Sequence, residues 1–228
     1  IFVLTGAGIS KESGIETFRD SDGLWNNHRV EDVATPEGFY RNPDLVYEFY
    51  NNRRKELNSG IQPNNAHLEL SNLEKYIKIN IITQNIDNLH ELSGSSKIIY
   101  IHGELNKARC IKNDQHVFKW MDDLTEKDKC NLCGSQMRPH IVWFGEMPFQ
   151  MDEIHSIAEK SDLFVSIGTS GEVYPAAGFV NMFKDMQKPT VELNLEPSQN
   201  KNLFDFAIYK PATIAVEEFK DLILKKIK

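Results

Sequence analysis

The sequence IFVLTGAGIS spans Ile1–Ser10 and joins an apolar, β-branched run to a turn that contains two glycines. Near-continuous apolar character is typical of a strand that is buried on both faces of a parallel sheet. Glycines directly after such a strand let the backbone approach a pyrophosphate, and the amides at a helix start stabilise its charge. The stretch therefore predicts the first strand of an α/β fold, followed by a phosphate-binding turn at residues 6–10. Taken alone, a tight strand-to-helix turn that binds no phosphate is the alternative.

Four more short apolar runs recur along the chain, at residues 79–83, 98–101, 163–167 and 190–195. Helical patterns lie between them. In one, Asn42 is placed to cap a helix that begins at Pro43, and in another a helical period runs to the C-terminus. This alternation predicts a Rossmann-like open parallel sheet with right-handed crossovers.

Two stretches depart from the alternation. Residues from about 21 to 73 contain several helices and no convincing strand, and residues from about 106 to 138 are polar and carry the cysteines. We expect one domain over residues 1–228, with a smaller lobe made of a helical insertion and a zinc-ribbon-like insertion. The large lobe then consists of about 1–20, 79–105 and 139–228. A cleft between lobes, at the carboxyl ends of the strands, is the natural place for a ligand.

Bulk properties exclude several classes of protein. A net charge of -7 argues against a nucleic-acid-binding surface, and no apolar run approaches the roughly 18 residues of a membrane span. Because an apolar strand stands at Ile1, we expect residues before it in the natural protein, where a targeting segment would lie. The three cysteines, Cys110, Cys130 and Cys133, cluster in a short stretch, which indicates reduced thiols and a metal rather than a disulfide framework.

Polar motifs follow the predicted strands. They are TQNIDNLH at 83–90, HG at 102–103, GTS at 168–170 and NLE at 194–196, and RPHIVWFGE stands at 138–146. Because the carboxyl ends of parallel strands meet at one edge of a sheet, we expect these groups to converge on one crevice. A lone histidine after a strand is usually structural, but an amide, a carboxylate and an imidazole at successive strand ends indicate catalysis.

A hydride-transferring dehydrogenase is disfavoured. Its dinucleotide fingerprint requires a small residue where Lys11 stands, and an acidic residue that closes a second strand about twenty residues later. Instead the glycine turn is followed by GIETFR at 14–19 and GLW at 23–25. With these motifs and those after the later strands, the chain resembles the sirtuin family over nearly its whole length. It is most similar to bacterial sirtuins and to those that remove succinyl and malonyl groups.

The resemblance implies an NAD-dependent protein-lysine deacylase acting in the cytoplasm of a bacterium. Acylated-lysine proteins are its expected partners, without nucleic acid or membrane, and NAD is consumed to give nicotinamide and O-acyl-ADP-ribose. His102 is implied as the general base for a ribose hydroxyl, a task that suits imidazole because its unperturbed pKa is near 6.5. Asn85 and Asp87 are implied as the other catalytic residues. The positions implied to bind NAD are Gly6, Ala7, Gly8, Ser10, Phe18, Arg19, Trp25, Gln84, Asn85, Ile86, Asp87, Gly168, Thr169, Ser170, Asn194, Leu195, Glu196 and Ala212.

The acyl-lysine peptide is implied to lie between residues 142–146 and 171–174, where it adds a strand to exposed backbone. The implied contact residues are Val142, Phe144, Gly171 and Val173. The plain alternative for Trp143 and Phe144 is core packing.

Tyr50 and Arg53 are three residues apart on one predicted helix, so their side chains share a face. A guanidinium fork and a phenol hydroxyl are suited to hold a carboxylate, and the spacing matches sirtuins selective for succinyl-lysine and malonyl-lysine. Ala34 matches the small residue that widens their acyl pocket. We therefore expect removal of succinyl, malonyl and acetyl groups; the plain alternative is a surface arginine beside a packed tyrosine.

A structural zinc site is implied but incomplete. Sirtuins commonly hold zinc with two Cys-x2-Cys pairs, of which Cys130 and Cys133 supply one. Cys110 begins the other, but Asn113 stands at its second position, and a neutral amide is a poor zinc ligand. Asp114, His116 or a water are open as the fourth ligand. Loss of the metal, with the loop held by packing alone, is the alternative.

Two rival functions use the same features. A protein ADP-ribosyltransferase would use the same NAD cleft with a different acceptor, and the mass of the product would distinguish it. A non-catalytic module that binds NAD or acyl-lysine would lack the imidazole of His102 or the pair Asn85 and Asp87, and all three residues are present.

Overall fold

The computed structural model describes residues 1–16, 24–25 and 28–227. Its main sheet has six parallel strands in the order β11-β10-β9-β1-β4-β5. Their bounds are β1 Phe2–Thr5, β4 Asn80–Thr83, β5 Ile98–Tyr100, β9 Phe164–Ile167, β10 Thr190–Asn194 and β11 Phe206–Tyr209. The central strands β1, β4 and β9 are buried at every position, as their apolar sequences predict. The predicted Rossmann-like parallel sheet is confirmed.

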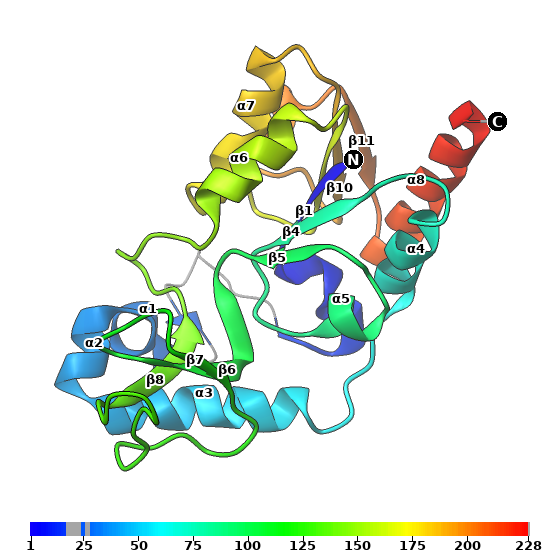
Figure 1. The fold of residues 1–228 in the computed structure, drawn as a ribbon. Coiled ribbons are helices and arrows are strands. Elements are labelled where there is room, and N and C mark those ends of the chain that lie inside the picture. Colours follow the sequence, from blue (N-terminus) through cyan, green and yellow to red (C-terminus); the bar gives the residue numbers. More distant parts are fainter. Residues whose placement is uncertain (17–23, 26–27, 228) are drawn as a thin grey trace. The chain divides into compact units, whose positions relative to one another are not determined.

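Helices cover both faces of this sheet (Figure 1). Alternate residues of a strand point to opposite faces, so β1 contributes to two separate cores. Val3 packs in a cluster with residues of α4 (Asn65–Leu73) and α8 (Ala212–Ile227). Phe2 and Leu4 pack in a second cluster with residues of α6 (Met151–Glu159) and α7 (Phe179–Asp185). The remaining short helices here are η1 Ala7–Ile9, η2 Lys11–Ser13, α5 Leu89–Leu92, η4 Ala176–Gly178 and η5 Lys201–Leu203.

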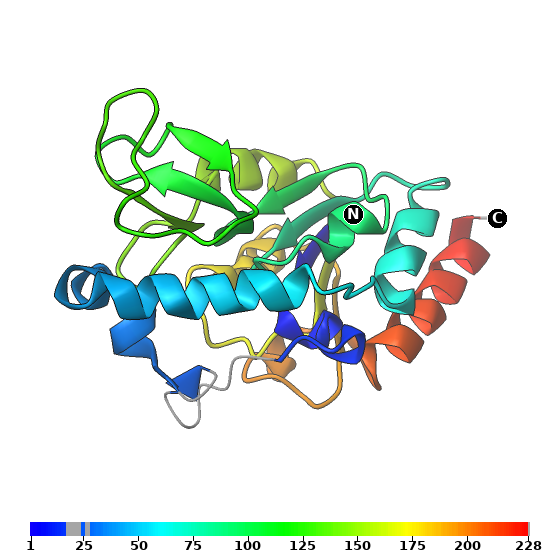
Figure 2. The same cartoon turned by 90° about the horizontal axis from the view of Figure 1, so that it is seen from below.

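A three-stranded antiparallel sheet carries the cysteine-bearing region, in the order β7-β6-β8. Its strands are β6 Gly103–Cys110, β7 Val117–Lys119 and β8 Met137–Ile141. The long helix α3 (Pro43–Leu57) lies along this small sheet (Figure 2). Tyr47 Oη donates to Met137 O at 2.6 Å, and Arg54 Nε donates to Leu105 O at 2.7 Å. These buried bonds attach the helix to both long strands.

The start of α3 follows the prediction. Asn42 Oδ1 accepts a hydrogen bond from Leu45 N at 3.2 Å, and Pro43 is the first helical residue. Two further helices precede it, α1 Val30–Val33 and α2 Pro36–Arg41.

The expectation of no strand between about residues 21 and 73 was wrong, because β2 (Leu24–Trp25) and β3 (His28–Arg29) form an antiparallel pair. Strands of two residues are too short to show a periodic pattern.

The chain divides into two compact units. One comprises Ile1–Thr17, Gln62–Ile101 and Gln150–Lys228, and the other comprises Phe18–Ile61 and His102–Phe149. Residues 62–73, which were expected in the smaller lobe, fall in the first unit. Leu70 and Leu73 of α4 pack in the core on one face of the parallel sheet. Residues 139–149 fall in the second because β8 pairs with β6.

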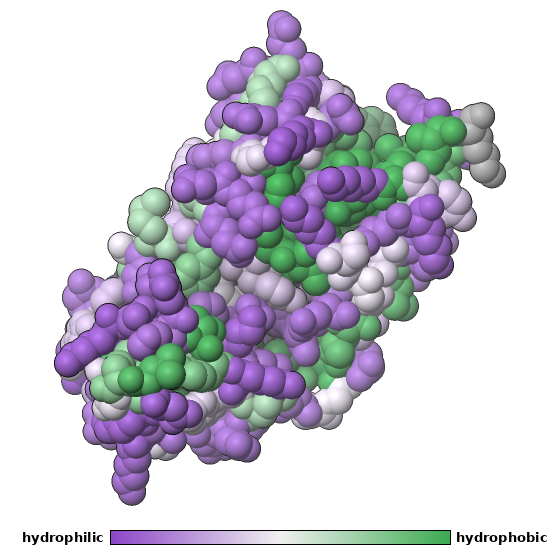
Figure 3. Space-filling model, in the orientation of Figure 1, coloured by the Kyte–Doolittle hydropathy of each residue, from purple (hydrophilic) through white to green (hydrophobic). Residues whose placement is uncertain are grey.

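The surface seen in Figure 3 is largely hydrophilic, and apolar residues gather toward the C-terminal helix α8. Leu222 and Ile227 of that helix are exposed. Among the described residues, every helix is too short or too polar to cross a bilayer.

Candidate active site

Two glycine turns in the first unit meet backbone to backbone. Gly6 N donates to Ile167 O at 3.0 Å, and Gly8 N donates to Gly168 O at 2.9 Å. A Cβ on Gly8 would lie 2.6 Å from Gly168 Cα, and Gly168 has a φ of +63°. Only glycine tolerates this contact, which leaves main-chain atoms at the carboxyl ends of β1 and β9 free of side chains. Such a cradle suits a pyrophosphate.

Ser10 is the centre of a buried polar network in the same unit. Its Oγ donates to Asp87 Oδ2 at 2.9 Å and accepts from Asn85 Nδ2 at 3.1 Å. Burial raises the pKa of Asp87, opposed by hydrogen bonds from the Leu89 amide and from Ser10. The predicted phosphate turn and the predicted amide–carboxylate pair are thus one hydrogen-bonded cluster.

His67 of α4 belongs to this cluster and was not predicted from the sequence. Its Nε2 lies 3.4 Å from Ser10 Oγ, and its Nδ1 lies 3.2 Å from Asn64 Oδ1. Burial lowers the pKa of His67 to about 4, so the imidazole is neutral near pH 7. The one nearby feature of the sequence that could have indicated this contact is Asn64, the capping residue of α4. Its Oδ1 accepts from Ala66 N, and its Nδ2 donates to Ile9 O.

The ends of β9 and β10 are joined by side chains that the resemblance implied to bind NAD. Asn194 Nδ2 donates to Thr169 O at 2.8 Å, and Thr169 Oγ1 lies 2.9 Å from Ser166 Oγ. Ser170, Leu195 and Glu196 are exposed beside them, and Ala212 begins α8. Of the other predicted NAD positions, Phe18 and Arg19 lie outside the described residues.

His102 lies in the second unit, immediately before β6. Its carbonyl accepts from Val142 N at 2.9 Å, so it is held beside the predicted peptide-binding segment. The close approach depends on Gly103, which has a φ of +87° and on which a Cβ would lie 1.9 Å from His140 O. The imidazole is half-buried.

The segment Val142–Glu146 is fixed by a partly buried ion cluster. Glu146 accepts from Arg138 at 2.6 and 2.9 Å, from Arg109 at 3.0 Å and from Trp143 N at 2.8 Å. Burial alone raises the pKa of Glu146, but the hydrogen bonds and charge of Arg138 hold it below its usual range. Phe144 N donates to Ala34 O at 2.9 Å, which brings the predicted small residue of the acyl pocket to this segment.

Trp143 and Phe144 differ in exposure. Trp143 is 2% exposed, so its side chain packs in the core, whereas Phe144 is 50% exposed.

Tyr50 and Arg53 are both buried on the inner face of α3 and meet in one aromatic cluster. The Arg53 guanidinium carbon lies 5.0 Å from the centre of the Trp25 ring and 4.6 Å from that of Phe49. The Tyr50 ring packs edge-on against both rings, with centroids 6.1 and 5.0 Å away. At 8% exposure, Arg53 is not the surface arginine of the plain alternative.

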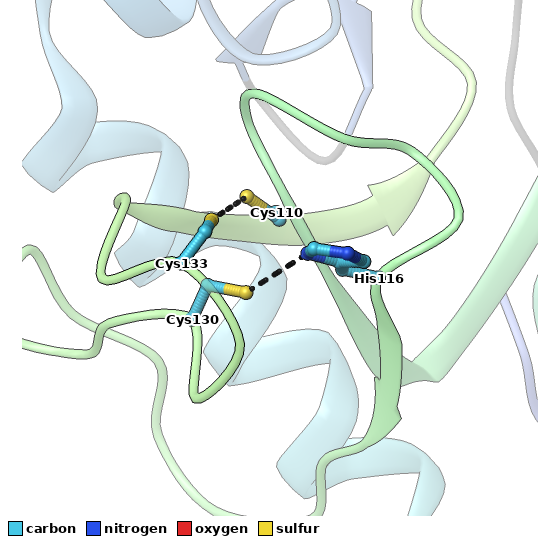
Figure 4. A group of neighbouring side chains, drawn as sticks. All are labelled: Cys110, His116, Cys130 and Cys133. Carbon is cyan, nitrogen blue, oxygen red and sulfur yellow. Dashed lines mark hydrogen bonds between the residues drawn. The ribbon is translucent and has the colours of Figure 1, made fainter.

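Three thiols and one imidazole come together at the end of the small sheet (Figure 4). Cys110 Sγ lies 3.4 Å from Cys133 Sγ, and Cys130 Sγ lies 3.3 Å from His116 Nδ1. The ligand atoms all lie within 4.8 Å of one another. This donor set fits a tetrahedral structural zinc, whose role would be to cross-link the loops that carry the four residues.

Comparisons with known proteins agree with this geometry. A family model described as the Sir2 family matches residues 6–175. The chain belongs to the Sir2 family, the sirtuins. An NAD-dependent protein deacylase of Escherichia coli (strain K12) is 55% identical over 233 residues, covering 100% of this chain and 83% of that protein. One from Vibrio cholerae is 56% identical over 229 residues, covering 98% of this chain and 93% of that protein.

Solved sirtuin structures share the fold. A Sir2 homologue in complex with NAD gives a TM-score of 0.85 at 35% identity, covering 100% of this chain and 91% of that one. A Sir2 protein bound to acetylated peptide gives a TM-score of 0.80 at 28% identity, covering 99% and 92%. The expected family and fold of this sirtuin are confirmed, NAD is its co-substrate, and the roles of its individual site residues stay predictions.

The sirtuin's metal cluster gives a direct prediction. His116 takes the place that the sequence left open between Asp114, His116 and a water. We expect about one zinc per chain, lost in His116→Ala together with a few kcal/mol of folding free energy. Metal analysis and the Tm with and without a chelator measure both. His116→Cys retains zinc, and so does the control Asp114→Ala; full zinc content in His116→Ala would show that the imidazole is not a ligand.

Gly8 gives a second prediction. In Gly8→Ala the new methyl group forces the turn after β1 away from the turn after β9, at a cost of about 1–3 kcal/mol. We expect the KM for NAD to rise at least about tenfold. Gly178→Ala is the control, because a Cβ there meets its nearest atom at an ordinary 3.7 Å. An unchanged KM for NAD in Gly8→Ala would remove the cradle from the NAD site.

Proposed function

We propose that this sirtuin removes succinyl and malonyl groups, as well as acetyl groups, from lysine side chains of proteins. Its enzyme class follows from its family: it is an NAD-dependent protein deacylase of the sirtuin type. NAD is consumed, and the proposed products are free lysine, nicotinamide and O-acyl-ADP-ribose.

The observation that carries the acyl preference is the buried pair Tyr50 and Arg53. The Arg53 guanidinium lies over the rings of Trp25 and Phe49, and the residue is 8% exposed, so its charge is largely removed from water. An ionised carboxylate is the ligand that best offsets such a buried charge, because the fork geometry permits paired hydrogen bonds. An acyl group with a distal carboxylate can form such bonds with Arg53, and acetyl cannot.

The remaining residues support deacylation of a lysine peptide. Val142–Glu146 presents backbone and the exposed Phe144 ring to an extended peptide, which is recognised mainly through its main chain. His102, held beside Val142, is proposed as the general base for a ribose hydroxyl of NAD. Asn85 and Asp87 are proposed to orient the ribose and carboxamide.

Relatives support the same substrates: one solved Sir2 homologue carries NAD and another Sir2 protein carries an acetylated peptide. The matched deacylases are bacterial, and a cluster of three thiols suits a reducing compartment. We accordingly place the enzyme's action in the bacterial cytoplasm.

One peptide sequence carrying acetyl-, butyryl- or succinyl-lysine tests the proposal, with and without NAD. Butyryl has the chain length of succinyl but ends in a methyl group, so it isolates the carboxylate. We expect NAD-dependent removal of acetyl and succinyl groups, with kcat/KM for succinyl at least about tenfold above that for butyryl, a difference of roughly 1.4 kcal/mol. A butyryl rate equal to the succinyl rate would contradict the preference and leave the enzyme class intact.

A further inference from the structure

Trp143 is buried beside the proposed acyl-binding residues and is fixed from several sides. The Arg138 guanidinium carbon lies 3.3 Å from the centre of its ring, and the Phe39 ring packs at 5.2 Å and 41°. Its backbone N–H donates to Glu146, which also holds Arg138. The indole therefore has one position and one direction in which its N–H can point.

That N–H points at Tyr50. Trp143 Nε1 lies 3.1 Å from Tyr50 Oη, and indole nitrogen is a donor only, so the tyrosine hydroxyl accepts this bond. Within the part of the chain that the structure describes, Trp143 is the one hydrogen-bond partner of the hydroxyl. Burial raises the pKa of Tyr50 above its ordinary value, so the hydroxyl keeps its proton near pH 7.

A hydroxyl has one hydrogen to donate. When the indole N–H occupies a lone pair of Tyr50 Oη, the O–H bond is turned away from the indole. The Tyr50 hydroxyl then donates its hydrogen to a group on the side away from the indole. Arg53, one helical turn along the same face of α3, is one of the charges that act on Tyr50. A carboxylate bound to Arg53 is an acceptor of the required kind.

We propose that Trp143 is a specificity-determining positioning residue, which orients the Tyr50 hydroxyl as a hydrogen-bond donor to the distal carboxylate of an acidic acyl group. The inference rests on the proposed function, because it concerns how the same acyl site distinguishes succinyl from a neutral chain. In this proposal the Trp143 indole does not touch the substrate. Arg138 and Glu146 act one step further away, since they hold the indole in place.

Trp143→Phe tests the proposal, because it keeps an aromatic ring against Arg138 and Phe39 and removes the N–H donor, together with part of the indole. We expect kcat/KM for the succinyl peptide to fall about three- to tenfold, mainly through KM, because the carboxylate is remote from the reacting carbon. The butyryl and acetyl peptides change by less than about twofold. Phe39→Leu is the matched control: it loosens the packing of the same indole but leaves the N–H in place, and its succinyl-to-butyryl ratio stays at the wild-type value.

A double-mutant cycle separates an effect through Tyr50 from a general one. In the Tyr50→Phe background, which lacks the hydroxyl, Trp143→Phe causes no further selective loss of succinyl activity. If the losses in kcat/KM for the succinyl peptide caused by Trp143→Phe and by Tyr50→Phe multiply in the double variant, the inference is overturned. It is also overturned if Trp143→Phe lowers kcat/KM for the butyryl peptide equally. A wild-type enzyme without desuccinylase activity instead overturns the proposed function. A wild-type desuccinylase that is impaired by Tyr50→Phe but not by Trp143→Phe overturns the inference alone.

A second measurement applies even where Trp143→Phe does not fold. The NMR resonance of the Trp143 indole N–H in the wild-type chain is assigned by comparison with variants in which Trp25 or Trp120 is replaced. Tyr50→Phe shifts this resonance and lowers its protection from solvent exchange. An unchanged resonance means that the indole does not donate to Tyr50, and it contradicts the proposal.

Discussion

Replacing His102 by glutamine lowers kcat/KM for every acyl peptide by a factor of about 10²–10⁴. The reason is chemical: the proposed step needs a base that removes a proton from a ribose hydroxyl near neutral pH, and an amide has no such capacity. The Gly103 contact that holds the backbone of His102 beside Val142 is untouched, so the Tm stays close to that of the wild type.

Steady-state kinetics with acetyl and succinyl peptides measure the loss. His155→Gln is the matched control, since it removes an exposed imidazole from α6 and leaves the activity unchanged. A loss smaller than about fivefold in His102→Gln would show that the general base is another residue.

Replacing Arg53 by methionine separates the acyl groups. Methionine is an unbranched, apolar side chain that can pack against Trp25 and Phe49 in place of the arginine but has no charge. Truncating one partner of a buried, hydrogen-bonded charge pair costs about 2–5 kcal/mol, so kcat/KM for the succinyl peptide falls at least about thirtyfold. The acetyl peptide, which has no carboxylate, changes by less than about threefold.

The matched control for Arg53 is Lys55→Met on the same helix. The ion pair of Lys55 with Asp123 is exposed, so removing that charge costs about 0–1 kcal/mol and leaves both acyl activities in place. Equal losses on the acetyl and succinyl peptides in Arg53→Met would mean that Arg53 serves the structure and does not bind the acyl carboxylate.

Much of the fold was predictable because it depends on local patterns. The apolar runs around Phe2–Thr5 and Phe164–Ile167 are buried on both faces, and Asn42 and Pro43 start α3 as their residue types predict. β11 escaped prediction because most of its residues are not buried. Phe206 and Tyr209 are exposed, so its sequence does not read as a buried run.

The site could be predicted where polar motifs directly follow strands. It could not be predicted where contacts between distant parts of the chain determine which side chains meet. Asn85 and Asp87 were expected near the glycine turn from their strand end, and both contact Ser10. Apart from the capping Asn64, nothing local indicated that His67 of α4 would reach Ser10. The sequence left the fourth zinc ligand open between Asp114, His116 and a water, and His116 joins the three thiols because β6 and β7 form a hairpin. The contact of Trp143 with Tyr50 joins residues 93 positions apart, which no spacing rule captures.

The mass of the NAD-derived product in a reaction with the succinyl-lysine peptide tests the central claim most directly. Deacylation by this sirtuin predicts O-succinyl-ADP-ribose, free-lysine peptide and nicotinamide in equal amounts, with none formed when NAD is omitted. A peptide that keeps its succinyl group and gains the mass of ADP-ribose would contradict the account and identify the protein as an ADP-ribosyltransferase.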